Sequence, residues 1–459
     1  MSNIHAVVLA AGQGTRMKSK LYKVLHPVCG KPMVQHVVDT LADMQVEDVV
    51  VVVGHGAETV KATLGDSVEY ALQAEQLGTA HAVLQAVPFL TGKTGTTLLL
   101  YGDVPLLSRE TLQHLLNHHL ENEAAATVLT AVLPDPTGYG RIVRDEAGEV
   151  LKIVEQKDAT PEERAIQEIN TGIYCYNNEQ LLQAIRQVKN DNAQKEYYVT
   201  DCVAILRDAG QKVLAYEAVD PDETMGVNDR VQLSEAEAYM RKRINERHMR
   251  NGVTIIDPAS TYIEADVKIG ADSIILPGSH LRGKTIVGQD VVLGPQADLT
   301  NVEVGDGVRI TYSVLVDSVV EDSVTVGPYA YVRPDSHIGS GAKIGDFVEL
   351  KNAKVGKGSK VPHLSYIGDA EIGEGVNIGC GTITVNYDGA KKHKTIVGDN
   401  AFVGCNTNLI APVEVGNNAY VAAGSTINQN VPDDALAIAR ERQTNKPGYA
   451  AKMPRKQGK

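Results

Sequence analysis

The chain has 459 residues, of which 43% are hydrophobic and 22% are charged, and its formal net charge is -13. This length predicts two or three domains, and the composition excludes wholesale disorder and a collagen-like chain. The acidic charge argues against a general nucleic-acid binder, because neutralising phosphates needs a basic surface. Anionic small substrates would need local basic clusters.

The cysteines are odd in number, and no pair has CxxC spacing. They are Cys29, Cys175, Cys202, Cys380 and Cys405. This pattern predicts reduced thiols in a cytoplasmic protein rather than a disulfide framework or a zinc ribbon. The apolar run 6–11 is too short for a signal-peptide core, and no stretch approaches the length of a membrane span. We therefore expect neither a membrane partner nor a nucleic-acid partner.

The first half of the chain alternates strand and helix patterns. Strands are expected at 4–11, 46–54, 68–73 and 96–101, and helices at 31–44, 58–64 and 79–86. Such alternation predicts a mostly parallel sheet covered by helices. Ligands of these sheets bind beyond the carboxyl ends of the strands, so the residues after each strand are the candidates for a site.

The second half begins after a charged helical segment at 231–249 and then follows a different period. From Ile263 an aliphatic side chain recurs at every sixth position. The repeats are Ile263, Ile269, Ile275, Leu281, Val287, Leu293 and Leu299, then Val304, Ile310 and Val316, then 320–350 and 397–427 in the same steps. This period predicts a triangular β-helix, since a β-sandwich would not keep a six-residue phase.

Glycine often follows the aliphatic residue of a repeat, as at Gly270, Gly288 and Gly345. We attribute these glycines to tight corners that need a permissive backbone. The flat outer faces of such a coil bury little surface, so self-association, most naturally threefold, is expected.

A glycine-rich segment, Leu9-Ala10-Ala11-Gly12-Gln13-Gly14-Thr15-Arg16-Met17, directly follows the first strand. Small residues let backbone N–H groups approach a nucleotide, and Arg16 adds a positive charge. The competing dinucleotide-binding GxGxxG motif lacks its third glycine. Together with Lys23-Val24-Leu25, the segment resembles the signature of the sugar-phosphate nucleotidyltransferases. The resemblance implies that the loop wraps the nucleotide phosphates while Arg16 and Lys23 stabilise the leaving pyrophosphate.

Asp103 follows the strand 96–101, and a carboxylate at that point beside a triphosphate suits Mg²⁺. On its own it equally fits a turn or a helix cap. The resemblance implies that Asn228 is the second Mg²⁺ ligand. The local sequence alone instead predicts that Asn228 is a helix N-cap before Val231. The segment 73–79 resembles a uracil-recognising segment, which implies that the nucleotide is UTP. The segment 196–201 resembles a segment that forms part of the wall of the sugar pocket. The nucleotide- and sugar-binding residues implied are Leu9, Ala10, Ala11, Gly12, Lys23, Gln73, Gly78, Thr79, Tyr101, Gly102, Asp103, Gly140, Glu155, Asn170 and Asn228.

Polar residues concentrate at 360–366 and 386–394, where the hexapeptide pattern is interrupted, and insertions from a solenoid usually mark its binding face. His363 is a candidate general base, because imidazole titrates near neutrality. We expect Glu349 to orient it. The alternatives are a solvated surface group or a buried histidine that hydrogen-bonds the backbone.

Across essentially the full chain, the two halves resemble the bifunctional bacterial enzymes of UDP-N-acetylglucosamine synthesis. This implies an α/β Rossmann-like nucleotidyltransferase domain (1–229), a linker helix (230–250) and a left-handed parallel β-helix of hexapeptide repeats with a C-terminal tail (251–459). His363 would deprotonate the amine of glucosamine 1-phosphate for attack on acetyl-CoA. UMP would then pass from UTP to N-acetylglucosamine 1-phosphate, with Mg²⁺, Arg16 and Lys23 neutralising charge.

The resemblance also implies a homotrimer and two further sets of site residues. The sugar-phosphate residues of the acetyltransferase site are Arg333, Lys351, Tyr366, Asn377, Asn386, Tyr387 and Lys392. The acetyl-CoA residues are Cys380, Cys405, Ala423 and Arg440, and the basic tail residues Lys446, Lys452, Arg455 and Lys456 would help to bind the CoA phosphates. The two thiols are expected not to act as nucleophiles.

Three alternatives stay open. Instead of a bifunctional enzyme, the chain could be a single-activity nucleotidyltransferase with a structural β-helix, a zinc lyase, or a non-catalytic nucleotide-sensing or interaction protein. The zinc site would need His337, His363 and His393 to converge at about 2.0–2.1 Å from one metal.

Overall fold

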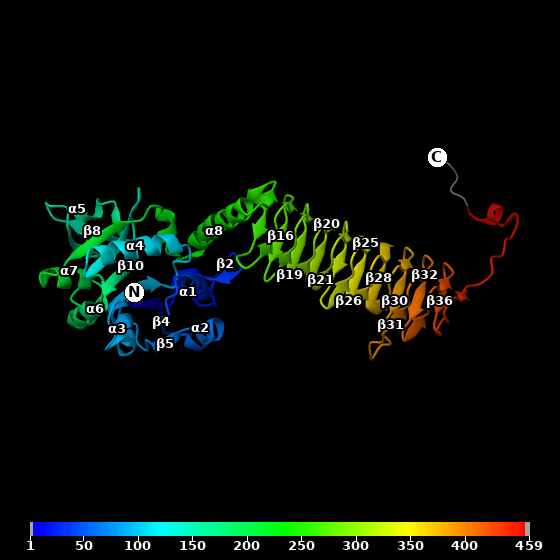
Figure 1. Ribbon diagram of the computed structural model, residues 1–459, viewed down its shortest axis with the longest axis horizontal. Helices are drawn as coiled ribbons and strands as arrows, with labels where there is room; N and C mark the ends of the chain where they lie inside the picture. The colour runs from blue at the N-terminus through cyan, green and yellow to red at the C-terminus, as the bar shows by residue number, and fades with distance from the viewer. Residues whose placement is uncertain (1–2, 455–459) are drawn as a thin grey trace. The chain divides into compact units, whose positions relative to one another are not determined.

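The computed structural model describes residues 3–454. The chain forms two compact units, one up to Arg243 and one from Ile244 onwards. The division falls within the long helix α8 (Arg230–Arg250) (Figure 1). Among the helices of the described residues, none combines the length and apolarity needed to cross a membrane.

The first unit is built on a sheet whose central strands are parallel. β1 (Ile4–Ala10) lies between β4 (Asp48–Val53) and β6 (Thr96–Tyr101), and β5 (Glu69–Leu72) follows β4 at the edge. The interior of β1 is fully buried, because helices cover both faces of the sheet. The carboxyl ends of these strands meet at one edge.

The other part of this sheet runs β6-β10-β7-β11, and β10 is antiparallel to both of its neighbours. The strands are β7 (Ala126–Val132), β8 (Gly140–Arg144), β9 (Val150–Val154), β10 (Glu168–Asn177) and β11 (Val213–Glu217). Tyr174 pairs with Leu99, so the beginning of β10 lies at the carboxyl end of β6. This reversal brings Asn170 and Gly172 towards the edge where the parallel strands end.

Two hydrophobic cores cover the two faces of the sheet, because alternate residues of each strand point to opposite sides. One core holds α3 (Thr79–Leu90), α6 (Asn178–Ala184) and α7 (Asp201–Asp208). The other holds α1 (Met33–Asp43), α2 (Ala57–Leu64) and α4 (Arg109–Glu121). The remaining helix, α5 (Pro161–Arg164), is a single turn with a capping box.

The first predicted helix begins two residues later than expected, because Lys31 and Pro32 pair with Pro27 and Val28 in a hairpin. This hairpin consists of β2 (Pro27–Val28) and β3 (Lys31–Pro32). Otherwise the expected strands and helices of this half are present, with ends shifted by a few residues.

The second unit is a parallel β-helix whose short strands stack coil upon coil (Figure 1). One row is an 11-stranded sheet, and long strands join the other two rows into a 15-stranded sheet. The first row is β12 (Thr254–Ile255), β15 (Ile274–Ile275), β18 (Val292–Leu293), β20 (Arg309–Ile310), β22 (Thr325–Val326), β25 (Lys343–Asp346), β27 (Lys360–His363), β29 (Asn377–Ile378), β32 (Phe402–Val403), β35 (Tyr420–Val421) and β37 (Leu436–Ala437).

The 15-stranded sheet holds β13 (Tyr262–Ile263), β14 (Lys268–Ile269), β16 (His280–Arg282), β17 (Ile286–Val287), β19 (Asp298–Val304), β21 (Val314–Val320), β23 (Tyr331–Val332), β24 (Ser336–Ile338), β26 (Glu349–Val355), β28 (Tyr366–Ile372), β30 (Ile383–Val385), β31 (Thr395–Val397), β33 (Asn408–Ile410), β34 (Val413–Val415) and β36 (Thr426–Ile427). Most of the predicted inward positions are buried, including Ile275, Leu281 and Leu299.

Three details of the predicted coil were wrong. The inward residue after Ile310 is Leu315, which is fully buried, and not Val316, which is only partly buried. Leu299 pairs with Leu315, so this coil is two residues shorter than the coil from Leu281 to Leu299. The spacing within one coil is therefore less regular than a strict six-residue repeat.

The second wrong detail concerns the glycines after the aliphatic residues. Gly270, Gly288 and Gly345 are not in the left-handed region of φ. A Cβ on Gly345 would instead lie 1.8 Å from the carbonyl oxygen of Pro362, one coil away. Glycine is thus needed because neighbouring coils stack closely, while residues such as Asp272, with φ of 61°, form the corners.

The third wrong detail is the interruption at 360–366. Val361 and Ile367 are fully buried and keep the six-residue step, and both belong to regular strands of the coil. Only 386–394 leaves the coil as a loop, between β30 and β31.

Candidate functional site

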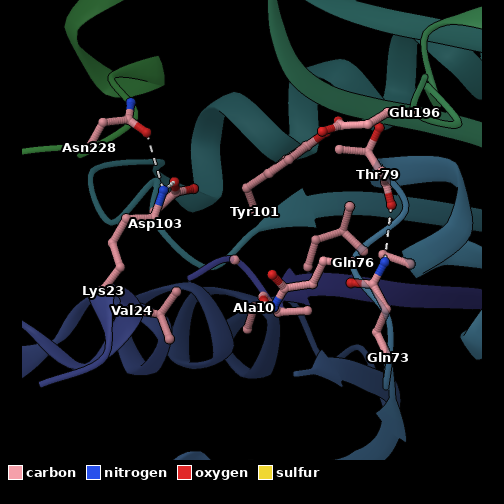
Figure 2. Close-up of a pocket in the computed structure, with 15 residues that line it drawn as sticks. Ala10, Lys23, Val24, Gln73, Gln76, Thr79, Tyr101, Asp103, Glu196 and Asn228 are labelled. Carbon is pink, nitrogen blue, oxygen red and sulfur yellow. Dashed lines mark hydrogen bonds and ion pairs between the residues drawn. The ribbon is translucent and has the colours of Figure 1, made fainter. Parts of the chain in front are cut away.

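A cavity of 330 Å³ opens in the first unit at the carboxyl ends of β1, β5 and β6 (Figure 2). Most of the predicted nucleotide-site residues line it. Its lining is Leu9, Ala10, Ala11, Gly12, Lys23, Val24, Gln73, Gln76, Gly78, Thr79, Ala82, Tyr101, Asp103, Glu196 and Asn228. Because these residues come from distant parts of the chain, the fold assembles the cavity as one site.

At one end of the cavity, the Lys23 ammonium donates to the Asp103 carboxylate and to Asn228 Oδ1, the latter at 3.2 Å (Figure 2). Arg16 Nη2 also donates to Asn228 Oδ1, at 2.9 Å, although Arg16 does not line the cavity. The backbone N–H of Val227 donates to the carbonyl of Asp103 at 2.9 Å, which holds the two segments together.

Asn228 is not the N-cap of α8. Asp229 takes that role, because its Oδ1 accepts from the backbone N–H groups of Val231 and Gln232 at 2.9 and 3.0 Å. The Asn228 amide oxygen is therefore free to face Lys23. The oxygens of Asp103 and Asn228 both accept from one ammonium group, so they converge on a single cation position. Carboxylate and amide oxygens are ligands that Mg²⁺ takes, and this pair fits such an ion.

At the other end of the cavity, Gln73 is buried and donates through Nε2 to the carbonyl of Gly78 at 3.1 Å. Gly78 has φ of 114°, and a Cβ there would lie 2.4 Å from the carbonyl oxygen of Tyr197. Gln76 donates to the carbonyl of Ala11 at 2.7 Å. Amide groups are thus held at fixed positions around this end of the cavity.

Gly140, Glu155 and Asn170 lie together beside Tyr101, outside the lining of the cavity. A Cβ on Gly140 would lie 3.5 Å from Asn170 Cβ and 3.6 Å from Glu155 Oε1. Burial raises the pKa of Glu155, against a hydrogen bond from Thr200 that lowers it. Burial also raises the pKa of Tyr101, and the charges of Glu155 and Asp103 add to the effect. Tyr101 therefore stays a neutral phenol.

Gly102 also lies outside the lining, and its N–H donates to the carbonyl of Leu9 at 2.9 Å. Four residues of the lining were not among the site residues predicted from the sequence: Val24, Gln76, Ala82 and Glu196. Three of them lie inside segments that the sequence singled out. Ala82 had a different signal, because it lies one helical turn after Gly78 and Thr79 on the same face of α3.

In the second unit, the imidazole of His363 is 54% exposed, and its Nδ1 lies 2.6 Å from Asp346 Oδ1. The expectation that Glu349 orients His363 was wrong, because Glu349 accepts instead from Arg333 at 2.9 Å. The register explains this outcome: Asp346 is directly opposite His363 on the adjoining coil. The hydrogen bond with His363 lowers the pKa of Asp346, which keeps this carboxylate ionised.

A polar cluster on the neighbouring row centres on Asp369, which the sequence did not single out. Its carboxylate accepts from Lys351 at 3.0 Å and from Asn386 at 2.5 Å. Asn386 also lies 3.4 Å from the Tyr366 hydroxyl. Burial works to raise the pKa of Asp369, but hydrogen bonds from Asn352, Lys351 and Asn386 outweigh it and lower the pKa.

The neighbouring Lys351 lowers the pKa of Lys392. Lys392 also lines a cleft of 390 Å³ beside Asp369. Tyr387 is exposed in the loop, and its hydroxyl donates to the carbonyl of Gly389. Asn377, like His363, lies on the other row and does not join the Asp369 cluster.

The predicted acetyl-CoA residues form a column along one corner of the coil. The register of β27, β29, β32 and β35 places His363, Cys380, Cys405 and Ala423 at equivalent positions of successive coils. Arg440 approaches the residue that follows Ala423 in the chain, since its Cδ lies 3.7 Å from the position of a Cβ on Gly424. Lys446 and Lys452 are exposed, whereas Arg455 and Lys456 lie outside the described residues.

The three histidines of the zinc alternative do not converge. His337, His363 and His393 each contact a different carboxylate, those of Glu321, Asp346 and Asp388, at 2.7, 2.6 and 2.7 Å. Within residues 3–454, no group of three or more His, Cys, Asp or Glu side chains is arranged to hold a metal ion.

Each half of the chain matches a known protein family. Residues 5–222 match the nucleotidyl transferase family, and 317–352 and 394–429 match the bacterial transferase hexapeptide family. The predicted fold, a Rossmann-like α/β nucleotidyltransferase domain followed by a left-handed β-helix of hexapeptide repeats, is confirmed.

Relatives match over nearly the whole chain. "Bifunctional protein GlmU" of Brevibacillus brevis is 77% identical over 456 residues and covers 99% of both chains. Proteins of the same name from Geobacillus sp. and Listeria monocytogenes are 59% and 58% identical, with 98% of each chain covered. With two matching transferase families and identity of this extent, the chain belongs to the family of bifunctional GlmU enzymes.

Proposed function

We propose that the chain makes UDP-N-acetylglucosamine in two reactions, one in each domain. Residues 1–229 form the uridyltransferase domain, 230–250 the linker helix, and 251–459 the acetyltransferase domain with its tail. The observation that carries the proposal is that each half has its own cluster of charged and polar groups, within a chain that belongs to a bifunctional family.

In the acetyltransferase domain, the substrates are glucosamine 1-phosphate and acetyl-CoA. Asp346 accepts a hydrogen bond from Nδ1 of His363, which leaves Nε2 as the acceptor for a proton of the substrate amine. The amine nitrogen attacks the thioester carbonyl, the C–S bond breaks, and CoA leaves as a thiolate that takes up a proton. Arg333, Lys351 and Lys392 supply the positive charge for the sugar phosphate.

The remaining acetyltransferase residues position the two substrates. Tyr366, Asn377, Asn386 and Tyr387 contact the sugar and its amine, and Asp369 holds Lys351 and Asn386 in place. Cys380, Cys405, Ala423 and Arg440 form the wall that acetyl-CoA lies against, mostly through their backbones.

In the uridyltransferase domain, the substrates are UTP and N-acetylglucosamine 1-phosphate. The loop from Leu9 to Gly12 cradles the nucleotide, while Gln73, Gly78 and Thr79 contact the base. The phosphate oxygen of the sugar attacks the α-phosphorus, and pyrophosphate leaves with its charge balanced by Arg16 and Lys23. Asp103 and Asn228 would hold Mg²⁺, which would supply further neutralisation of the phosphate charge.

Tyr101, Gly102, Gly140, Glu155 and Asn170 form the sugar pocket of this domain. Gly140, Glu155 and Asn170 lie together beside the cavity that Tyr101 lines. We further propose that the protein acts in the cytoplasm as a homotrimer on small-molecule substrates, with no nucleic-acid or membrane partner.

One assay tests the proposal. The full-length protein is incubated with glucosamine 1-phosphate, acetyl-CoA, UTP and Mg²⁺, and the products are identified by mass. We expect UDP-N-acetylglucosamine, pyrophosphate and free CoA. Omission of acetyl-CoA must stop the pathway unless N-acetylglucosamine 1-phosphate is supplied. Product formation only from N-acetylglucosamine 1-phosphate would support the single-activity alternative, and no product from either sugar would contradict both.

A further inference from the structure

Two thiols lie at equivalent positions on adjacent coils of the β-helix. Ile378 of β29 pairs with Val403 of β32, and Cys380 and Cys405 follow them at the same distance along the chain. The N–H of Asn406 donates to the carbonyl of Cys380 at 2.7 Å. A Cβ on Gly379 would lie 2.5 Å from the backbone nitrogen of Cys405. Both contacts show that the two cysteine backbones are direct neighbours.

These two thiols differ from the other cysteines in exposure. Cys405 is exposed and Cys380 is half-buried, whereas Cys29, Cys175 and Cys202 are buried. Burial also raises the pKa of Cys175 and Cys202, which disfavours their reactive thiolate forms. Oxidants in solution therefore meet the two stacked thiols first.

The geometry of the coil suits a bond between them. Neighbouring strands lie about 4.8 Å apart, within the Cα separation of about 4.4–6.8 Å that a disulfide spans. Side chains of this column also meet across coils, because His363 and Asp346 occupy adjoining equivalent positions and touch at 2.6 Å. Both thiols are free in this structure.

We propose that Cys380 and Cys405 are a redox switch, which a hydroperoxide closes as a disulfide to turn acetyl transfer off. This proposal rests on the proposed function, because the same column forms the acetyl-CoA wall above His363. A disulfide places a rigid bridge on that wall and ties together the two backbones that acetyl-CoA lies against. Acetyl-CoA bound against the wall covers the thiols and protects them.

The chemistry balances with the hydroperoxide as oxidant. The Cys405 thiolate attacks the terminal oxygen, the O–O bond breaks, and an alcohol (water, if the oxidant is hydrogen peroxide) leaves. The thiolate of Cys380 then attacks the sulfenic sulfur, the S–O bond breaks, and the hydroxide leaves as water after protonation. Two thiols lose two electrons in total, and a dithiol reductant reverses the reaction by exchange.

The test uses the reduced full-length protein treated with hydrogen peroxide. Free thiols are blocked in acid, the protein is digested, and peptides are identified by mass. We expect a peptide pair joined through Cys380 and Cys405, with Cys29, Cys175 and Cys202 recovered as blocked thiols. Acetyl transfer falls by about tenfold or more and recovers with dithiothreitol, while uridyl transfer stays within about twofold. Saturating acetyl-CoA slows formation of the bridge.

The matched variants are Cys380→Ser and Cys405→Ser. The ratio of acetyl transfer with and without peroxide is measured within each variant, and we expect it to approach one. Peroxide treatment that leaves separate sulfinic acids, or a bridge that forms without loss of acetyl transfer, would overturn the proposed switch. The mass measurement is independent of turnover, so a protein without any acetyl transfer would contradict the proposed function and leave the bridge itself still testable.

Discussion

The two units build their sites in different ways. In the α/β unit, Lys23, Asp103 and Asn228 come from three distant segments and meet in a cavity, where Lys23 and Asp103 are 14% and 13% exposed. In the β-helix, the key residues lie along successive coils, and His363 remains 54% exposed. A sheet edge covered by loops can enclose a site within one chain. A solenoid presents an open row, which agrees with the proposed trimer, in which a neighbouring subunit would complete the acetyltransferase site.

The largest expected effect separates the two sites. His363→Ala removes the proposed base, and we expect acetyl transfer to fall by about 10²- to 10⁴-fold. Uridyl transfer, measured as pyrophosphate release from UTP and N-acetylglucosamine 1-phosphate, should be retained. Equal loss of both activities would contradict two independent sites.

Asp103→Asn is the reciprocal change in the enclosed site. The variant keeps the shape of the side chain but loses the charge that faces Lys23, so Mg²⁺-dependent pyrophosphate release should fall by at least about 100-fold. Binding of Mn²⁺, followed by its electron paramagnetic resonance signal, should weaken as well. Unchanged turnover would remove the metal role of Asp103, and intact acetyl transfer serves as the folding control.

Asp346→Asn tests the open site at the residue that positions the imidazole. An amide in place of the carboxylate weakens the hold on His363 Nδ1, so kcat of acetyl transfer should fall by roughly tenfold and its pH profile should shift. Glu349→Gln is the matched control, because Glu349 contacts Arg333 instead. We expect that control to change KM for the sugar phosphate while the pH profile of kcat stays in place. The reverse pattern would restore Glu349 as the orienting residue.

The smallest effect concerns stability in acid. His119 of α4 is buried and contacts Thr127 at 3.0 Å, and burial, followed by the charge of His118, lowers its pKa to about 4. The unfolded state therefore binds a proton that the folded state does not between about pH 6.5 and 4. The stability that neutral His119 gives is present above pH 6.5 and is lost as the pH falls towards 4.

His119→Gln should flatten that acid dependence of the free energy of unfolding by at most about 2–3 kcal/mol. The measurement is denaturant unfolding of variant and parent from pH 4 to 7, followed by a signal of the first unit. An unchanged slope would show that His119 is not held neutral.

Local patterns were enough for much of the fold. The unbroken apolar runs of the parallel strands and the six-residue period of the β-helix both appear directly in the sequence, because each reflects burial on a regular backbone. The sequence does not show which atoms of the neighbouring coil a Cβ would meet. The glycines at 270, 288 and 345 were therefore attributed to tight corners rather than to close stacking of coils. The sequence also did not predict the short coil before Leu315, because a change in coil length becomes apparent only once the pairing of the strands is known.

For the sites, short segments predicted which residue types would be present, including Lys23, Asp103 and His363. The partners of these residues depend on the tertiary structure. The register between two coils places Asp346, and not Glu349, opposite His363. Asp229 caps α8, so the side chain of Asn228 can face Lys23 instead. The sequence by itself determined the two architectures and the chemical groups available to each. Only the tertiary structure decided which groups meet, because pairing between strands and segments sets distances that local spacing does not contain.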